Sequence, residues 1–222
     1  MMNTEVKGLD KMNPIERIKN LFLNPKKLMD YVEKEATITF PMLIIIIMNF
    51  LIVGLKFNDF KELVREQLQG NGVEVTDKII NVTALFTPII TVLSLVISIL
   101  ILSIVFFAFS KVLKGKISFK QCISVVTYSS VVNVIGVILL FVISLITGSF
   151  KFSTNINIFD ILNVDMSTSF IYTIFNYITI SNILSLWQHV LIAIGITKIS
   201  GINKKYVYIF TALVYLVSVY MI

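Results

Sequence analysis

The stretch that decides the fold is TALFTPIITVLSLVISILILSIVFFAF, residues 83–109, which contains no Asp, Glu, Lys or Arg. A helix that crosses a membrane needs about 20 predominantly apolar residues, because the hydrocarbon core is ~30 Å thick. In lipid, a single continuous segment can satisfy its backbone hydrogen bonds only as a helix. Residues 83–109 therefore predict a transmembrane helix.

Four more blocks share this character, at 37–55, 123–146, 170–197 and 206–222, and none of them contains Asp, Glu, Lys or Arg. The whole chain is 56% hydrophobic and 14% charged, with a mean hydropathy of +0.89. Soluble domains carry about 25% charged residues. The sequence thus predicts an all-α, polytopic membrane protein built as a bundle of five transmembrane helices.

The hydrophilic N-terminal segment, residues 1–36, is predicted to precede the membrane domain, residues 37–222. Asn13-Pro14 and Asn24-Pro25 are typical helix starts, since asparagine caps a helix and proline suits its first turn. We expect two short amphipathic helices, which either bind a cytosolic partner or lie on anionic lipid. The candidate cations of this docking or lipid-binding surface are Arg17, Lys19, Lys26 and Lys27. Residues 58–70 predict a further short amphipathic helix.

Positive charge alternates along the hydrophilic segments, and this alternation predicts the orientation. Lys and Arg number seven in 1–36, four in 56–82, four in 110–122, one in 147–169 and three in 198–205. With the N-terminus inside, 14 positive residues lie in the cytoplasm and 5 outside. We therefore expect a plasma-membrane protein with a cytoplasmic N-terminus and an extracellular C-terminus. The net charge of +6 follows from this asymmetry and does not indicate nucleic-acid binding.

The second block carries hydroxyl residues at helical spacing. Such a stripe lets helices approach closely and hydrogen-bond across their contact, although it is also compatible with a solute path. Asn133 in the third block needs a partner, and the hydroxyls of this stripe are the expected ones. The candidate helix-packing stripe consists of Thr83, Thr87, Thr91, Ser94 and Ser98.

The fourth block is the most polar. Ser181, Asn182, Ser185, Gln188 and His189 fall on one side of a helix with 100° per residue. Together with Asn133 they form the candidate intramembrane polar cluster. One interpretation is a cleft that binds a ligand or conducts protons, and the other is a hydrogen-bonded cluster that holds the helices in register.

No recognised catalytic pattern is present. The chain lacks a Walker A loop, a Gly-x-Ser-x-Gly elbow and a His-Glu-x-x-His pair. Its only histidine has no Cys or carboxylate companion at ligand spacing. We therefore predict a non-enzymatic protein without catalytic residues, cofactor, metal site or bound nucleotide.

Three stretches resemble a known family. They are Pro14–Ile18 with Asn24–Lys27 and Thr39-Phe40-Pro41, then Tyr128-Ser129, and finally Trp187–Leu191 with Gly195-Ile196, Ile199-Ser200-Gly201 and Lys204-Lys205. Their order is similar to that in the Yip family of five-span membrane proteins, named for eukaryotic members that interact with Ypt/Rab GTPases. The abundance of Ile, Lys and Asn is typical of an AT-rich bacterial genome.

The resemblance implies a function without chemistry of its own. Bacterial relatives look like accessory proteins of membrane transport, some of them associated with ABC-type exporters. The first hypothesis is therefore an accessory or scaffold protein of a transport system, in contact with membrane lipids and with transporter subunits or further copies of itself. The alternative is a small oligomeric permease or channel that uses the polar face of the fourth block.

Overall fold

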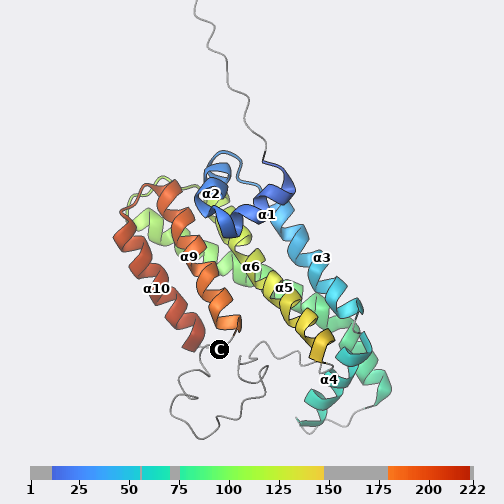
Figure 1. Cartoon of the computed structure of the whole chain (residues 1–222). Helices are drawn as coiled ribbons and strands as arrows, with labels where there is room; N and C mark the ends of the chain where they lie inside the picture. The colour runs from blue at the N-terminus through green and yellow to red at the C-terminus, as the bar shows by residue number, and fades with distance from the viewer. Residues whose placement is uncertain (1–11, 56, 71–75, 148–179, 221–222) are drawn as a thin grey trace, which may run out of the picture.

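The computed structural model describes residues 12–55, 57–70, 76–147 and 180–220. All regular elements in these ranges are α-helices, and Figure 1 shows their arrangement. The helices are α1 (Pro14–Leu23), α2 (Pro25–Lys34), α3 (Thr39–Leu55), α4 (Phe57–Gly70), α5 (Asp77–Val112), α6 (Phe119–Thr147), α9 (Ile180–Ser200) and α10 (Lys204–Tyr220).

The helices confirm an all-helical membrane protein, and two of them qualify as spans by length and composition. These are α5 and the part of α9 from Ile183 to Ser200. A third is added if α3 and residues 60–70 of α4, bent by 89°, cross together as one broken span. Helices α3 and α10 have 17 residues each, and a rise of about 1.5 Å per residue makes them shorter than ~30 Å of hydrocarbon. The number of five spans stays a prediction.

The two short N-terminal helices begin where the sequence predicted. The Asn13 side chain accepts a hydrogen bond from the Glu16 backbone at 2.9 Å, and the Glu16 carboxylate accepts one from the Asn13 backbone at 3.2 Å. Asn24 caps α2 by accepting from the Lys27 backbone at 3.2 Å. Each cap satisfies amide donors that the first helical turn leaves free.

The N-terminal cap, residues 12–35, packs onto the bundle and shares its hydrophobic core. Leu21, Leu28, Met29 and Val32 are fully buried. Helix α2 lies against α9 and α6. Figure 1 shows α1 and α2 across the end of the bundle from which α3 starts. The cap is therefore part of the same folded unit as the bundle. The sequence had predicted residues 1–36 as a segment that precedes the membrane domain.

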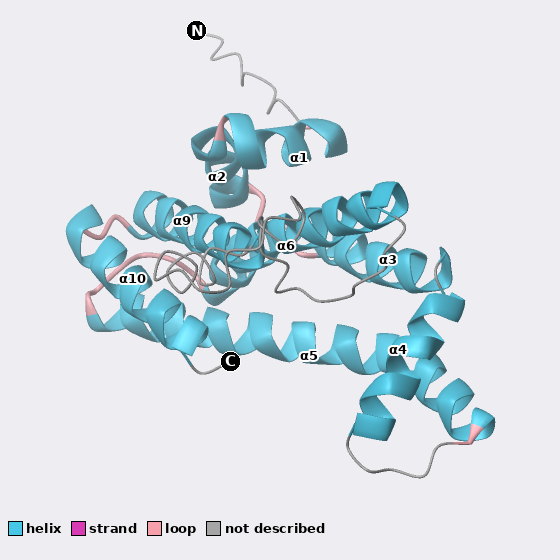
Figure 2. Cartoon of the chain, turned by 60° about the horizontal axis from the view of Figure 1, so that its bottom comes forward, coloured by secondary structure: helices cyan, strands magenta, loops and turns pink. Residues whose placement is uncertain are grey.

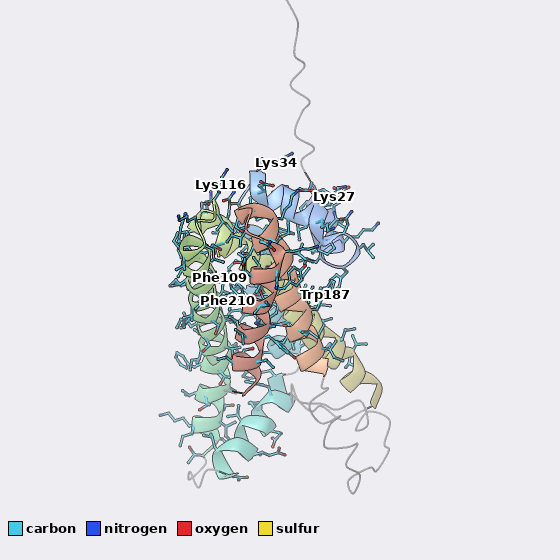
Figure 3. All side chains as sticks on the ribbon, turned by 90° about the vertical axis from the view of Figure 1, so that its left-hand side faces the viewer. Lys27, Lys34, Phe109, Lys116, Trp187 and Phe210 are labelled. Carbon is cyan, nitrogen blue, oxygen red and sulfur yellow. The ribbon has the colours of Figure 1, made fainter. Side chains whose placement is uncertain are left out.

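Helix α6 occupies the centre of the described bundle. It packs on α9, α5 and α3, and its residues 124–132 are all buried. Figure 2 shows α5 alongside the layer that α3, α6 and α9 form. Helix α10 packs on α9 and also reaches α5, since the rings of Phe210 and Phe109 stack with centroids 3.9 Å apart (Figure 3).

Two glycines permit the close approach of α6 and α9. A Cβ atom at Gly136 would overlap the Leu184 side chain. A Cβ atom at Gly195 would lie 2.6 Å from Val125 Cγ1 and 2.8 Å from Met29 Sδ. A larger residue at either position would require these neighbouring side chains, or the helices that carry them, to shift.

Segments rich in Lys and Arg meet at one end of the molecule. Backbone and side-chain contacts join them: Lys116 N donates to Ser200 O at 3.0 Å, and Gln121 Nε2 donates to Glu33 O at 2.8 Å. Lys198 Nζ forms an ion pair with Asp30 at 2.9 Å. Figure 3 shows Lys27, Lys34 and Lys116 at this end. We call residues 12–35, 110–121 and 198–205 the basic end; they contain 12 Lys or Arg and 4 Asp or Glu.

Candidate functional site

A chain of side-chain hydrogen bonds joins α6 to α9. Gln188 Oε1 accepts from Asn133 Nδ2 at 2.6 Å, and Gln188 Nε2 donates to Ser130 Oγ at 3.0 Å. Ser130 Oγ in turn donates to Val126 O at 2.9 Å. Both ends of the Gln188 amide are thus satisfied within the bundle. We call Ser130, Asn133 and Gln188 the amide cluster.

The partner of Asn133 differs from the expected one. The sequence suggested the hydroxyls of α5, whereas the structure places Gln188 of α9 there. The reason is the small side of α6 at Gly136, against which Leu184 of α9 packs. This contact brings α9, and not α5, within hydrogen-bond distance of Asn133.

His189 lies next to the amide cluster but bonds separately. Its Nδ1 is 2.8 Å from Ser185 O. A carbonyl oxygen only accepts, so Nδ1 carries the hydrogen and Nε2 is a bare acceptor in a neutral ring. The Nε2 atom is buried without a hydrogen-bond partner. The ring meets Tyr215 edge-on with centroids 5.3 Å apart.

The remaining members of the predicted polar cluster contribute less. Ser185 supplies its backbone oxygen to His189. The side chains of Ser181 and Asn182 lie outside the described residues. Within the described ranges, no group of three or more His, Cys, Asp or Glu is placed to hold a metal ion.

The predicted stripe on α5 lies mostly on the outside of the described bundle. Thr83 and Thr87 are half-buried, and Thr87 Oγ1 donates back to Thr83 O at 2.8 Å. Thr91, Ser94 and Ser98 are exposed. The described helices therefore do not use these three hydroxyls as a packing seam.

Sequence reasoning missed the hydroxyl residues of α5 that are buried. Ser103 and Ser110 are fully buried on the same side as Ile99 and Phe106. Ser103 Oγ donates to Ile99 O at 2.6 Å, and Ser103 O accepts from the buried Cys122 Sγ at 3.3 Å. Positions 99, 103, 106 and 110 recur at helical spacing and lie on one side of a helix. This pattern in the sequence could have indicated which side of α5 is buried.

Arg17 connects the cap to the bundle. Its guanidinium lies over the rings of Tyr31 at 4.4 Å and Phe40 at 5.2 Å. Its Nη1 donates to Tyr128 OH at 3.4 Å, and its Nε donates to Met12 O at 2.9 Å. The buried Tyr128 hydroxyl is also 3.0 Å from Thr37 Oγ1. We call this arrangement the Arg17–Tyr128 contact.

Of the four cations predicted to form a surface, the half-buried Arg17 is therefore engaged in contacts within the protein, because its planar head lies over aromatic rings. Lys19, Lys26 and Lys27 are exposed. The remaining candidate surface consists of these three lysines.

Comparison with known families identifies the Yip1 domain over residues 19–222, which is nearly the whole chain. The chain belongs to the Yip1 domain family. It is accordingly a membrane-associated protein of a family without catalytic chemistry. Searches of curated proteins and of solved structures found no match.

The stretches that carry the Yip resemblance meet in space. Arg17 of the first stretch contacts both Phe40 of the same stretch and Tyr128 of the second. Gly195 of the third stretch packs against Val125 of α6 and Met29 of the cap. Residues of the three stretches thus take part in the contacts between the cap and the bundle.

The amide cluster makes a first prediction. We expect Gln188→Leu to lower the free energy of unfolding by about 1–2 kcal/mol, because it leaves the Asn133 amide unpaired in an apolar setting. Adding Asn133→Leu to this variant should restore part of the loss. Ser98→Leu, at an exposed position of α5, is the control. Unfolding by SDS titration in bicelles compares these three variants with the unchanged protein. A Gln188→Leu variant as stable as the control would contradict the proposed contact.

Proposed function

We propose that this Yip1 protein is a non-enzymatic accessory or scaffold subunit of a membrane transport system, such as an ABC-type exporter. In this proposal the chain crosses the bacterial plasma membrane five times, its basic end faces the cytoplasm and its C-terminus lies outside. The charge asymmetry of the sequence supports this orientation, since Lys and Arg are retained on the cytoplasmic side.

The observation that carries the proposal is that polar side chains of the bundle and the cap hydrogen-bond to one another within the protein. Gln188 and Asn133 satisfy one another between α6 and α9, and Arg17 fixes the cap on the bundle through Tyr128. Such contacts stabilise a rigid bundle with a charged end, as a platform for other proteins requires. They also occupy both ends of the Gln188 amide, which is therefore not free to bind a solute.

The exposed part of the α5 stripe is the proposed contact with partner helices. Thr91, Ser94 and Ser98 lie on the least covered long helix, among large exposed apolar side chains such as Ile97 and Ile101. Small hydroxyl residues permit close helix packing in lipid. A transporter subunit or a second copy of the chain would cover them.

Co-purification from native membranes tests this function. We expect transporter subunits to accompany the tagged chain at a constant ratio in a lipid-preserving polymer. Ser94→Leu with Ser98→Leu should reduce their recovery on the order of tenfold, which corresponds to ~1.4 kcal/mol of lost contact. Ile97→Leu with Ile101→Leu is the matched control on the same helix. If the chain is always recovered alone and its deletion leaves export intact, the proposal fails.

The alternative, a small oligomeric permease or channel, is favoured by one observation, the unpaired Nε2 atom of His189. In that case purified protein in liposomes would conduct a solute, and His189→Ala would abolish the flux. The absence of any flux from liposomes that contain correctly folded protein would exclude this alternative.

A further inference from the structure

Helix α1 carries apolar side chains on its outer side as well as on the side that packs. Leu21 points into the core and is 1% exposed. By contrast, Ile15 is 78% exposed, Leu23 is 71% exposed and Phe22 is 40% exposed. An outward apolar face of this size on a short helix indicates a surface that is covered in the working protein.

Exposed lysines border this face. Lys19 lies between Ile15 and Phe22 at spacings of four and three residues, so the three side chains share one side of α1. Lys26 and Lys27 follow in the first turn of α2. The ion pairs of the described residues involve other groups, which leaves these ammonium groups without a carboxylate in contact.

The position of α1 determines what lies nearby. It belongs to the basic end, which carries 12 Lys or Arg against 4 Asp or Glu. The cap lies across the end of the helix bundle (Figure 1). At the ends of membrane-spanning helices, hydrocarbon gives way to lipid headgroups. A lysine there can bury its methylene stem beside apolar side chains while its ammonium group reaches a phosphate.

We propose that the outer face of α1, formed by Ile15, Lys19, Phe22 and Leu23 together with Lys26 and Lys27 of α2, binds the anionic lipid headgroups of the surrounding leaflet. The apolar side chains enter the interfacial layer and the lysines contact lipid phosphates. Charge complementarity selects this occupant, because the surface combines apolar area with an excess of positive charge. The inference requires only the membrane bundle and is independent of the transporter partner.

The full-length chain in vesicles provides the test. Its only cysteine, Cys122, is fully buried, so a cysteine placed at position 22 can be labelled selectively. The probe is Phe22→Cys with an environment-sensitive fluorophore, in vesicles of phosphatidylcholine with or without phosphatidylglycerol. Lipids spin-labelled near the headgroup quench the fluorophore when α1 enters the interface. Lys34→Cys, an exposed polar position in the same cap and outside the proposed face, is the matched label site.

We expect stronger quenching at position 22 with phosphatidylglycerol, and a decrease in high salt. Each of Lys19→Gln, Lys26→Gln and Lys27→Gln should lower the equilibrium constant for immersion about fivefold. The matched charge control is Lys116→Gln with Lys204→Gln and Lys205→Gln, three exposed lysines of the basic end outside the cap. Circular dichroism establishes that each variant is folded.

Two outcomes would overturn the inference. Equal quenching in both vesicle types would mean that the face rests in the interface without recognising anionic lipid. If only an aqueous reagent quenched the fluorophore in both vesicle types, the face would lie in water. It would then be suited to bind in the groove of a protein partner. Ile15→Cys, at the most exposed position of the face, must give the same result as Phe22→Cys.

Discussion

Replacing Gly195 with leucine should displace the cap from the bundle. The new Cβ would lie 2.6 Å from Val125 Cγ1 and 2.8 Å from Met29 Sδ, and the rest of the side chain has no space between α2, α6 and α9. Both neighbours are fully buried, so neither can move into solvent. Overpacking of this kind costs typically about 1–3 kcal/mol, and more when backbone must shift.

The expected result is a loss of protection in α2. Hydrogen exchange of the amides of α2 should accelerate toward that of an exposed helix, and thermal stability should fall. Gly54→Leu is the control, because a Cβ at Gly54 meets no atom within 4 Å. If Gly195→Leu and Gly54→Leu exchanged at the same rate in α2, the described packing of the cap on the bundle would be wrong.

Replacing Arg17 with alanine should release α1 from the bundle. The variant loses the contacts of the guanidinium with two aromatic rings and with the Tyr128 hydroxyl. A cation over an aromatic ring contributes about 0.5–2 kcal/mol, and a hydrogen bond to a charged group about 1.5–3 kcal/mol. Arg17 is partly exposed, and solvent therefore weakens these contacts. We expect the variant to lose about 2 kcal/mol of the free energy that keeps α1 docked on the bundle.

Limited proteolysis of α1 in lipid nanodiscs measures this loss. Cleavage should accelerate in Arg17→Ala, whereas Lys34→Ala, at an exposed cation of the same cap that lies outside the proposed lipid-binding face, should behave as the natural protein. Arg17→Lys should not restore protection, because an ammonium group lacks the planar fork that lies over the two rings. Tyr128→Phe should produce part of the effect, and adding it to Arg17→Ala should add little. Equal cleavage of Arg17→Ala and Lys34→Ala would refute the Arg17–Tyr128 contact.

The helices themselves were predictable, because their signals are local. The capping box at Asn13 and the cap at Asn24 were confirmed at the residues that the sequence indicated. Each long apolar block contains a helix in its described part. The length of an apolar block and the residues that cap a helix are local features of the chain. Both can therefore be recognised in a single sequence.

The partners of the polar residues were harder to predict, because they depend on the rotation of one helix against another. Lipid and protein are both apolar surroundings, so hydrophobic periodicity does not tell which side of α5 packs. The stripe at Thr91, Ser94 and Ser98 therefore looked like a seam, while the buried hydroxyls are those of Ser103 and Ser110. Arg17 looked like a surface cation, since its contact with Tyr128 joins residues 111 positions apart.

The central claim is that this Yip1 protein presents its basic end to a transport partner. The most direct measurement is photo-crosslinking in living cells, with a photoreactive residue at Lys204 of the basic end, outside the proposed lipid-binding face, and, as a control, at Glu66 in α4. Both side chains are exposed in the described structure. The account predicts adducts with subunits of one transport system from Lys204 and not from Glu66. Adducts with such a system from Glu66 alone, or only lipid adducts from both positions, would contradict it.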